Sequence, residues 1–269
     1  MKTVLALVDF SDASTNALSF AAELSKRTSA RLVIMNIIQK GEDEEETKKK
    51  LTSIESDLKK SFDSKLNCES LIAHGTLIPT LKKITAVQQP DLIVMGTKGA
   101  TGLKKILIGS NTVKVLANIK VPVLVIPEVA RFESFLNKGK NRIVLATDLD
   151  LLENEEALNI LKEIALIIIG SKVRVLSVRP NNTVLPDLKR MERDFLLSFF
   201  NPEIETERMT VFSSNVIGGI NFYLNQKSKD AGLIAMIARD SGHLIQKHYT
   251  REMASYTHLP LLVLHDAKI

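Results

Sequence analysis

The stretch Leu92-Ile93-Val94-Met95-Gly96-Thr97-Lys98-Gly99 joins an apolar run to closely spaced glycines, and Gly109-Ser110 follows ten residues later. The apolar run is typical of a buried strand. Glycine lacks a Cβ, so main-chain N–H groups beside it can approach a phosphate closely. Ser110 is positioned to cap a following helix, whose first turn attracts anions. The pattern Gly-x2-Gly-x9-Gly-Ser therefore indicates a phosphate cradle.

Other interpretations of these glycines remain open at this point. They can serve only a turn and a helix start, because such short patterns occur often for structural reasons. The pattern is not a P-loop, since five residues stand between Gly96 and Gly102 and Leu103 stands where the lysine is required. Nor is it a dinucleotide fingerprint, because Gly-x-Gly-x-x-Gly is absent.

Strands and helices alternate on either side of this motif. Besides Leu92–Met95, we expect strands at Thr3–Val8, Arg31–Ile38, Ser70–Ala73 and Val121–Ile126. We expect helices at Ala13–Thr28 (capped by Ser11 or Asp12), from Glu42 to about Lys65, at Ile78–Val87 and from Ser110 onward. Short, continuously apolar strands that alternate with helices predict a parallel sheet covered on both faces. Such doubly wound sheets bind ligands at the carboxyl ends of their strands.

The chain then repeats itself. Lys2–Asp9 recurs as Asn141–Asp148, and Val121–Ile126 recurs as Leu259–Leu264. In the second half we expect strands at Ile143–Thr147, Lys172–Val178, Glu207–Val211, Gly232–Ile237 and Leu261–Leu264, and helices at Glu153–Ile169, near Leu185–Phe200 and near Val216–Gln226. We therefore predict an α/β chain of two tandem doubly wound five-stranded parallel-sheet domains, over residues 1–127 and 141–269, with a linker at 128–140.

Composition restricts the cellular setting and the partners. The chain has 269 residues, a formal net charge of +5 and a single cysteine, Cys68, which fits a reducing compartment. No run of apolar residues is long enough for a membrane span and no signal-peptide pattern appears, so we expect a cytoplasmic protein with no membrane partner. Lysines and arginines are scattered, and the densest run, Lys48–Lys50, follows Glu44–Glu46 at a spacing that favours ion pairs. We therefore expect no nucleic-acid partner.

Taken together, these residues resemble the universal stress protein family. Val8-Asp9-Phe10-Ser11, His74-Gly75, Met95–Gly99 and Gly109-Ser110 stand where the pattern of its ATP-binding branch has them. The resemblance covers both halves of the chain. It implies a Rossmann-like fold of the adenine nucleotide alpha hydrolase-like type, with strand order 3-2-1-4-5, and it favours the phosphate interpretation of the glycines.

The resemblance also implies roles for individual residues. Asp9 and Ile37 would contact the adenine, and Met95 and Gly96 would lie against the ribose. The phosphates would be held by main-chain N–H groups and hydroxyls of Gly99, Gly109, Ser110, Asn111 and Thr112. Mg²⁺ would be held mainly through phosphate oxygens, because the sequence offers no dedicated carboxylate cage. Asp9 could instead cap the first helix, although it lies two or three residues early for that role.

The second half departs from the pattern. Ile237 stands near the position of Gly96 and Asp240 near that of Gly99, and Gln246–Thr250 contains no Gly-Ser. A branched side chain and an aspartate would obstruct or repel a phosphate, and Asp148 alone makes no site. We therefore expect a degenerate second domain. The histidines 243, 248 and 258 are spaced wrongly for one helical face, so we predict no metal site.

Three classes of function remain open: a regulator, an enzyme, and a scaffold that binds no ligand. The leading hypothesis is a stress-response regulator, in which bound ATP orders residues 96–110 and changes the surface offered to a protein partner that the sequence does not identify. The alternative is an enzyme, a weak ATP hydrolase or a nucleotidyl transferase. No catalytic residue is predicted, because the motif consists mostly of glycines and backbone donors.

The strand order predicts that the fifth strand of each domain lies at a sheet edge, and exposed apolar edges tend to pair. We expect Val121–Ile126 and Leu259–Leu264 to pair antiparallel, which would make the chain an intramolecular pseudo-dimer. The sequence leaves open whether the whole chain also forms a homodimer.

Overall fold

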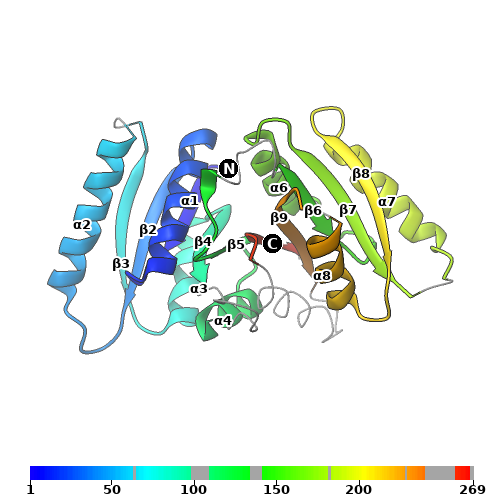
Figure 1. The fold of residues 1–269 in the computed structure, drawn as a ribbon. Coiled ribbons are helices and arrows are strands. Elements are labelled where there is room, and N and C mark those ends of the chain that lie inside the picture. The colour runs from blue at the N-terminus through cyan, green and yellow to red at the C-terminus, as the bar shows by residue number, and fades with distance from the viewer. Residues whose placement is uncertain are drawn as a thin grey trace. The chain divides into compact units, whose positions relative to one another are not determined.

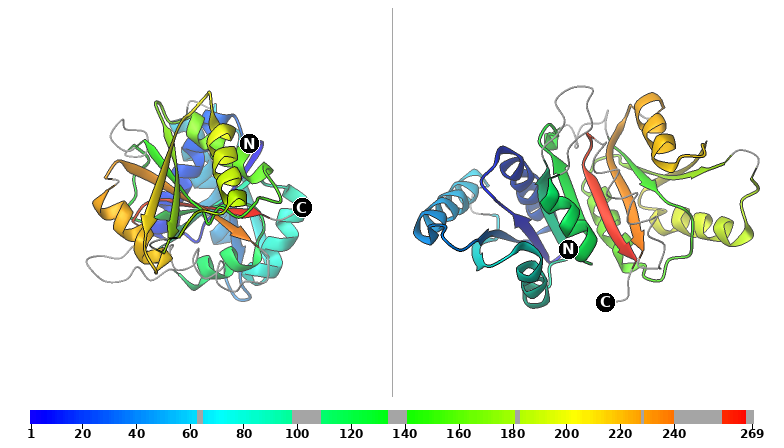
Figure 2. Two further views of the ribbon diagram at one scale, coloured as in Figure 1. Left: turned by 90° about the vertical axis from the view of Figure 1, so that its right-hand side faces the viewer. Right: turned by 90° about the horizontal axis from the view of Figure 1, so that it is seen from below.

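A computed structural model describes residues 1–62, 65–97, 109–133, 141–180, 183–227, 229–239 and 258–266. The chain divides into two compact units, with Phe132 closing the first and Glu133 opening the main part of the second. In each unit, helices lie on both faces of a parallel sheet (Figures 1 and 2).

Strands and helices alternate strictly in the described part of the first unit. Its elements are β1 (Thr3–Leu7), α1 (Asp12–Thr28), β2 (Arg31–Ile38), α2 (Glu44–Ser61), β3 (Cys68–His74), α3 (Leu77–Gln88), β4 (Leu92–Thr97), α4 (Ser110–Asn118) and β5 (Val123–Pro127). Parallel pairing gives the order β3-β2-β1-β4-β5. The connections reverse direction after β3, so α1 and α2 cover one face and α3 and α4 cover the other (Figure 1).

The second unit repeats this order. Its elements are β6 (Arg142–Ala146), α6 (Glu156–Leu166), β7 (Lys172–Arg179), α7 (Asp187–Phe200), β8 (Glu205–Phe212), α8 (Val216–Gln226), β9 (Ala231–Arg239) and β10 (Leu261–Asp266). Parallel pairing gives β8-β7-β6-β9-β10. The predicted strand order 3-2-1-4-5 is therefore observed in both units.

Several strands form the buried core of each sheet, as their apolar sequences require. Leu32–Ile34 in β2 and Leu92–Val94 in β4 are fully buried, and so are Leu233–Ala235 in β9 and Leu261–Leu264 in β10. Because both faces of these strands are covered by helices, their side chains do not alternate between apolar and polar.

Most element bounds agree with the sequence prediction to within two residues, but both ends of the first helix of the second unit differ by three. That helix, α6, begins at Glu156 rather than at Glu153 and ends at Leu166 rather than at Ile169. The first turn is lost because the preceding segment is held in another way, as described below.

Residues 128–132, which the sequence assigned to the linker, pack against the first unit. The Asn16 side chain donates hydrogen bonds to the carbonyl oxygens of Pro127 and Ala130 at 3.1 and 3.0 Å. The Phe132 ring meets Phe20 edge to face at a centroid distance of 5.2 Å. These contacts continue the first unit beyond its last strand.

Within the described ranges, no helix combines the length and the apolar character that crossing a bilayer requires.

Candidate functional site

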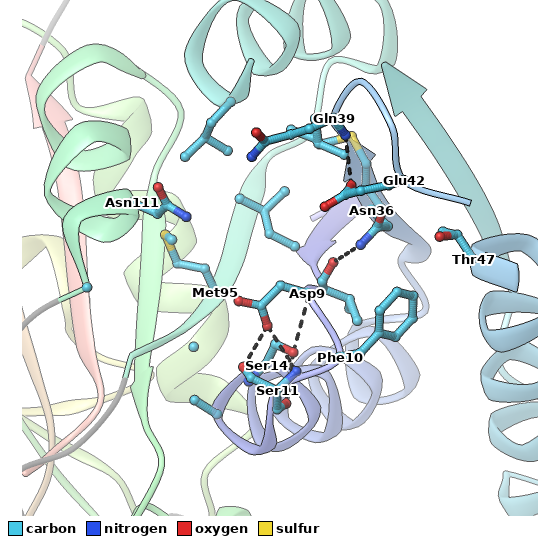
Figure 3. Close-up of a pocket in the computed structure, with 18 of the residues that line it drawn as sticks. Asp9, Phe10, Ser11, Ser14, Asn36, Gln39, Glu42, Thr47, Met95 and Asn111 are labelled. Carbon is cyan, nitrogen blue, oxygen red and sulfur yellow. Dashed lines mark hydrogen bonds between the residues drawn. The ribbon is translucent and has the colours of Figure 1, made fainter. Parts of the chain in front are cut away.

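A pocket of about 590 Å³ opens at the carboxyl ends of β1, β2 and β4 in the first unit. Strand order reverses between β1 and β4, which is where doubly wound sheets leave a crevice. The starts of α1, α2 and α4 complete the walls. Figure 3 shows the pocket, with Asn111 across from Phe10 and Thr47.

The pocket brings together eight of the nine site residues expected from the sequence. They are Asp9, Ile37, Met95, Gly96, Gly109, Ser110, Asn111 and Thr112. The ninth, Gly99, lies outside the described residues. Residues from three strand ends and one helix start thus meet at one place, although they are far apart in the sequence.

The carboxylate of Asp9 is held by the start of α1. Its Oδ1 accepts hydrogen bonds from the Ser11 hydroxyl at 2.6 Å and from the Ser11 backbone N–H at 3.1 Å. Phe10, between them, has a φ of 63°, which turns the chain sharply enough for this contact. Ser11 is the N-cap of α1 and accepts from Ser14 N at 3.3 Å. Asp9 is therefore not the cap but a carboxylate positioned by it.

This hydrogen bonding makes Asp9 a stable anion. Partial burial by itself raises the pKa of the Asp9 carboxyl, but hydrogen bonds from Ser11 and Ser14 outweigh burial and leave the pKa below its ordinary value. An ionised Asp9 can accept a hydrogen bond from a ligand hydroxyl or amine. It is a poor general base, because a lowered pKa reduces its affinity for a proton.

Gly96 is required by the packing of α1. A Cβ at this position would lie 2.3 Å from the carbonyl oxygen of Ala13 and 2.8 Å from the backbone nitrogen of Ser14. The sequence interpretation assigned this glycine to the approach of a ligand. The structure shows a different reason for it, the close approach of α1 to β4.

Gly109 has the opposite environment. A Cβ built on it would have Thr112 Oγ1, 4.0 Å away, as its nearest neighbour, and its φ of −55° is open to any residue. Gly109 is also the N-cap of α4, so Ser110 is the first helical residue and not the cap. This corrects the expected capping role of Ser110, because Gly109 is the last non-helical residue and Ser110 already has helical geometry.

The wall formed by the end of β2 and the start of α2 was not predicted. It contributes Asn36, Gln39, Glu42, Asp43, Glu46, Thr47 and Lys50. Positions 43, 46, 47 and 50 follow helical spacing on one face of α2, and that spacing, directly after a strand end, could have revealed them. Glu42 is held in place by a 2.8 Å hydrogen bond from the Gln39 backbone N–H to its Oε2.

The described residues fit a nucleotide on three counts. A volume of about 590 Å³ lies within the range of ligand pockets, roughly 300–1,000 Å³. The first N–H groups of α4 have no partner within the helix, and Gly109 leaves space in front of them. Thr97, a pocket-lining residue only 3% exposed, has a buried hydroxyl with no hydrogen-bond partner within the described ranges.

Residues 1–127 match the Universal stress protein family over almost the whole first unit. The first unit is a universal stress protein domain. Universal stress protein MJ0577 of Methanocaldococcus jannaschii is 35% identical to this chain over 82 residues, which cover 30% of the chain and 49% of that protein. The match thus spans about half the length of that curated relative.

The universal stress protein fold extends over both units. The crystal structure of a universal stress protein from Archaeoglobus fulgidus superposes with a TM-score of 0.75 and 20% identity, covering 98% of each chain. A protein from Pseudomonas aeruginosa described as functionally unknown superposes with a TM-score of 0.68 and 14% identity, covering 99% of this chain and 93% of its own. At these identities the likeness shows the fold alone.

The second unit lacks the glycine against which α1 packs in the first unit. Leu7 pairs with Met95 in the first sheet and Ala146 pairs with Met236 in the second, so Ile237 takes the position of Gly96, as the sequence predicted. Asp240 and residues 246–250 lie outside the described residues. The His/Cys/Asp/Glu side chains within the described ranges form no group of three that could hold a metal ion.

Proposed function

We propose that the first unit binds ATP and that the chain acts as a nucleotide-dependent regulator. The observation that carries this proposal is the pocket at the ends of β1, β2 and β4. The start of α4 forms one of its walls, and Gly109 before that helix has no side chain to block the approach of a ligand. A helix N-terminus with free N–H groups and a glycine before it suits a phosphate chain.

Charge orients the nucleotide within the pocket. Asp9, Glu42, Asp43 and Glu46 line it, and Lys50 is the one cationic side chain among the described lining residues. Four carboxylates around the β1 and β2 ends repel phosphates and favour groups that donate hydrogen bonds, such as ribose hydroxyls and the adenine amine. The phosphates then extend toward Gly109, Ser110, Asn111 and Thr112, and Mg²⁺ binds mainly through their oxygens.

A regulatory role is favoured over catalysis by the chemistry of Asp9. This carboxylate lies in the pocket and is accessible to water, but its lowered pKa makes it a weak base for activating an attacking water. Nucleotide binding then acts by favouring one conformation of the protein over another, which changes what a partner protein meets.

The direct test is to identify nucleotide that accompanies the purified full-length protein. The protein is denatured, and the released small molecules are separated and identified by mass spectrometry, while calorimetry with Mg-ATP gives affinity and stoichiometry. We expect ATP, and about one site per chain. Absence of co-purified nucleotide together with no calorimetric binding would refute the proposal.

A matched pair of variants locates the site, and turnover separates the regulator from the enzyme. Asp9→Asn should weaken ATP binding at least about tenfold, because it loses a charged acceptor. Asp12→Asn, an exposed aspartate three residues further on, should bind ATP like the unaltered protein.

Incubation with Mg-ATP should release no ADP or AMP in stoichiometric excess over protein, whereas multiple turnovers would favour the hydrolase or transferase.

A further inference from the structure

The same sharp turn follows the first strand in both units. Asp148 takes the place of Asp9, and Leu149 has a φ of 61° where Phe10 has 63°. Asp148 Oδ1 accepts the Asp150 backbone N–H at 3.1 Å, just as Asp9 Oδ1 accepts that of Ser11. The second unit thus presents a carboxylate at the corresponding strand end.

The chain after this turn follows a different course. In the first unit α1 begins at Asp12, and its backbone lies against the bare Cα of Gly96. In the second unit Ile237 brings a branched side chain to that position, so an equally close approach is blocked. The helix α6 begins only at Glu156, eight residues after Asp148, and residues 149–154 cross the end of the sheet without forming a helix.

Arg239, at the end of β9, binds this non-helical segment. Its Nη1 donates to Asp148 Oδ1 at 2.9 Å, and its Nη2 donates to the carbonyl oxygen of Asp150 at 2.6 Å. Its Nε donates to Asp266 Oδ2 at 3.1 Å. All three guanidinium nitrogens are therefore used, and the Arg239 side chain is only 7% exposed.

The acceptors are themselves held in place. Asp266, whose side chain is 2% exposed, accepts the backbone N–H groups of Glu153 and Asn154 at 2.8 Å each through Oδ1. Lys189 on α7 donates to the Asp148 carbonyl oxygen and to Asp150 Oδ1, both at 2.7 Å. Residues 149–154 are thus held at both ends, by Arg239 and Lys189 near Asp150 and by Asp266 near Asn154.

We propose that Arg239 is a built-in ligand of the second unit: its guanidinium occupies the carboxylates at the strand ends, where the first unit presents Asp9 to an open pocket. The cluster formed by Arg239, Asp148, Asp150 and Asp266 holds residues 149–154 with no nucleotide bound. An external ligand would have to displace three hydrogen bonds that the chain itself supplies, two to carboxylates and one to a backbone carbonyl. This inference stands independently of ATP binding in the first unit.

The test uses hydrogen exchange of the full-length protein without nucleotide. Arg239→Ala leaves the buried Asp266 carboxylate without its cationic partner, which is strongly destabilising locally. We expect the amides of Glu153 and Asn154 to exchange at least about tenfold faster, because their acceptor Asp266 is no longer held. Amides of β1 and β2 in the first unit should be unchanged. Arg208→Ala, an exposed arginine on β8, is the matched control and should leave all these amides unaltered.

Two further measurements complete the test. Methylguanidinium at millimolar concentration should restore protection in Arg239→Ala, because it has the charge and the planar donor geometry of the lost group, whereas methylammonium should restore much less. If Arg239→Ala does not fold, Arg239→Lys carries the test, and it should also accelerate exchange at Glu153 and Asn154. Unchanged exchange in Arg239→Ala, or in Arg239→Lys if only that variant folds, would overturn the proposal. Equal restoration of amide protection by methylguanidinium and methylammonium would also overturn the proposal.

Discussion

The Cα of Gly96 lies so close to α1 that a Cβ on it would come within 2.3 Å of the Ala13 carbonyl oxygen. These are backbone atoms, which cannot rotate away from a new Cβ as the end of a flexible side chain can. This contact brings the start of α1, with Ser11 and Ser14, beside the end of β4, and so sets the distance between two walls of the pocket. Gly96 is therefore part of the site through packing.

The first prediction follows from this contact. Gly96→Ala should destabilise the first unit by about 1–3 kcal/mol, because α1 must shift away from β4. Gly109→Ala, in open space with φ of −55°, should change stability by no more than about 0.5 kcal/mol. Urea unfolding of the full-length variants measures both, and equal stability of the two variants would contradict the packing role of Gly96.

The second prediction concerns Gly109 as the place where phosphate approaches. Gly109→Val should leave the protein folded, since the nearest atom to the new Cβ is 4.0 Å away, yet weaken ATP binding by about 100-fold or more. The branched side chain would stand between the phosphates and the N–H groups of α4. Calorimetry gives the affinity and circular dichroism the fold. Undiminished affinity in a folded variant would remove the cradle from the proposed site.

The third prediction concerns the pKa of Asp9. Ser11→Ala removes a hydroxyl donor and should raise this pKa, measurable by ¹³C NMR of the carboxyl carbon, whereas Ser19→Ala on the exposed side of α1 should not. Because the folded-state pKa of Asp9 is depressed, ionised Asp9 stabilises the fold above its unfolded pKa of about 3.9. That stabilisation should be lost as the pH falls through the folded-state pKa, so the stability difference from Asp9→Asn should shrink at acidic pH. A difference independent of pH would show that the carboxylate is not held as described.

The fourth prediction distinguishes the two units by their corresponding aspartates. Asp148→Asn should leave ATP affinity and a stoichiometry of one per chain unchanged, because Asp148 is already bound by Arg239 and Ile237 replaces the critical glycine. Calorimetry of Asp148→Asn beside Asp9→Asn measures this. Two ATP molecules per chain, or a loss of binding in Asp148→Asn, would mean that the second unit takes a nucleotide.

The fifth prediction comes from the sequence alone and concerns the two edge strands. If Val123–Pro127 and Leu261–Asp266 pair antiparallel, every amide hydrogen of residues 123–126 and 261–266 should exchange slowly in NMR experiments. An unpaired edge strand protects only alternate amides, those that face its neighbour in the sheet. Alternating fast and slow exchange along either strand would exclude the pairing. Lysine substitutions at Val123 and Val125 would test the pairing less cleanly, because both side chains are buried.

Much of the site was accessible from local sequence. The apolar runs and the glycine motif predicted β4 and the start of α4, and the repeat of Lys2–Asp9 at Asn141–Asp148 predicted the second unit. The acidic wall of the pocket was missed, although positions 43, 46, 47 and 50 carry the spacing of one helix face. The reason is that their charges are equally typical of a solvated helix.

By itself the sequence determined the α/β class, the duplication, the order of elements and most of the strand-end residues, because hydrophobic periodicity and glycine positions are local properties. Tertiary structure alone decided why Gly96 is a glycine, how Ser11 holds Asp9, and that Arg239 reaches Asp148 and Asp266. Most of these contacts join residues distant in the chain, and whether a given arginine meets a given carboxylate depends on sheet register and helix start. In the second unit, a single branched side chain at Ile237 blocks the close helix approach, and the carboxylate that is open to a ligand in the first unit is bound there by the chain's own guanidinium.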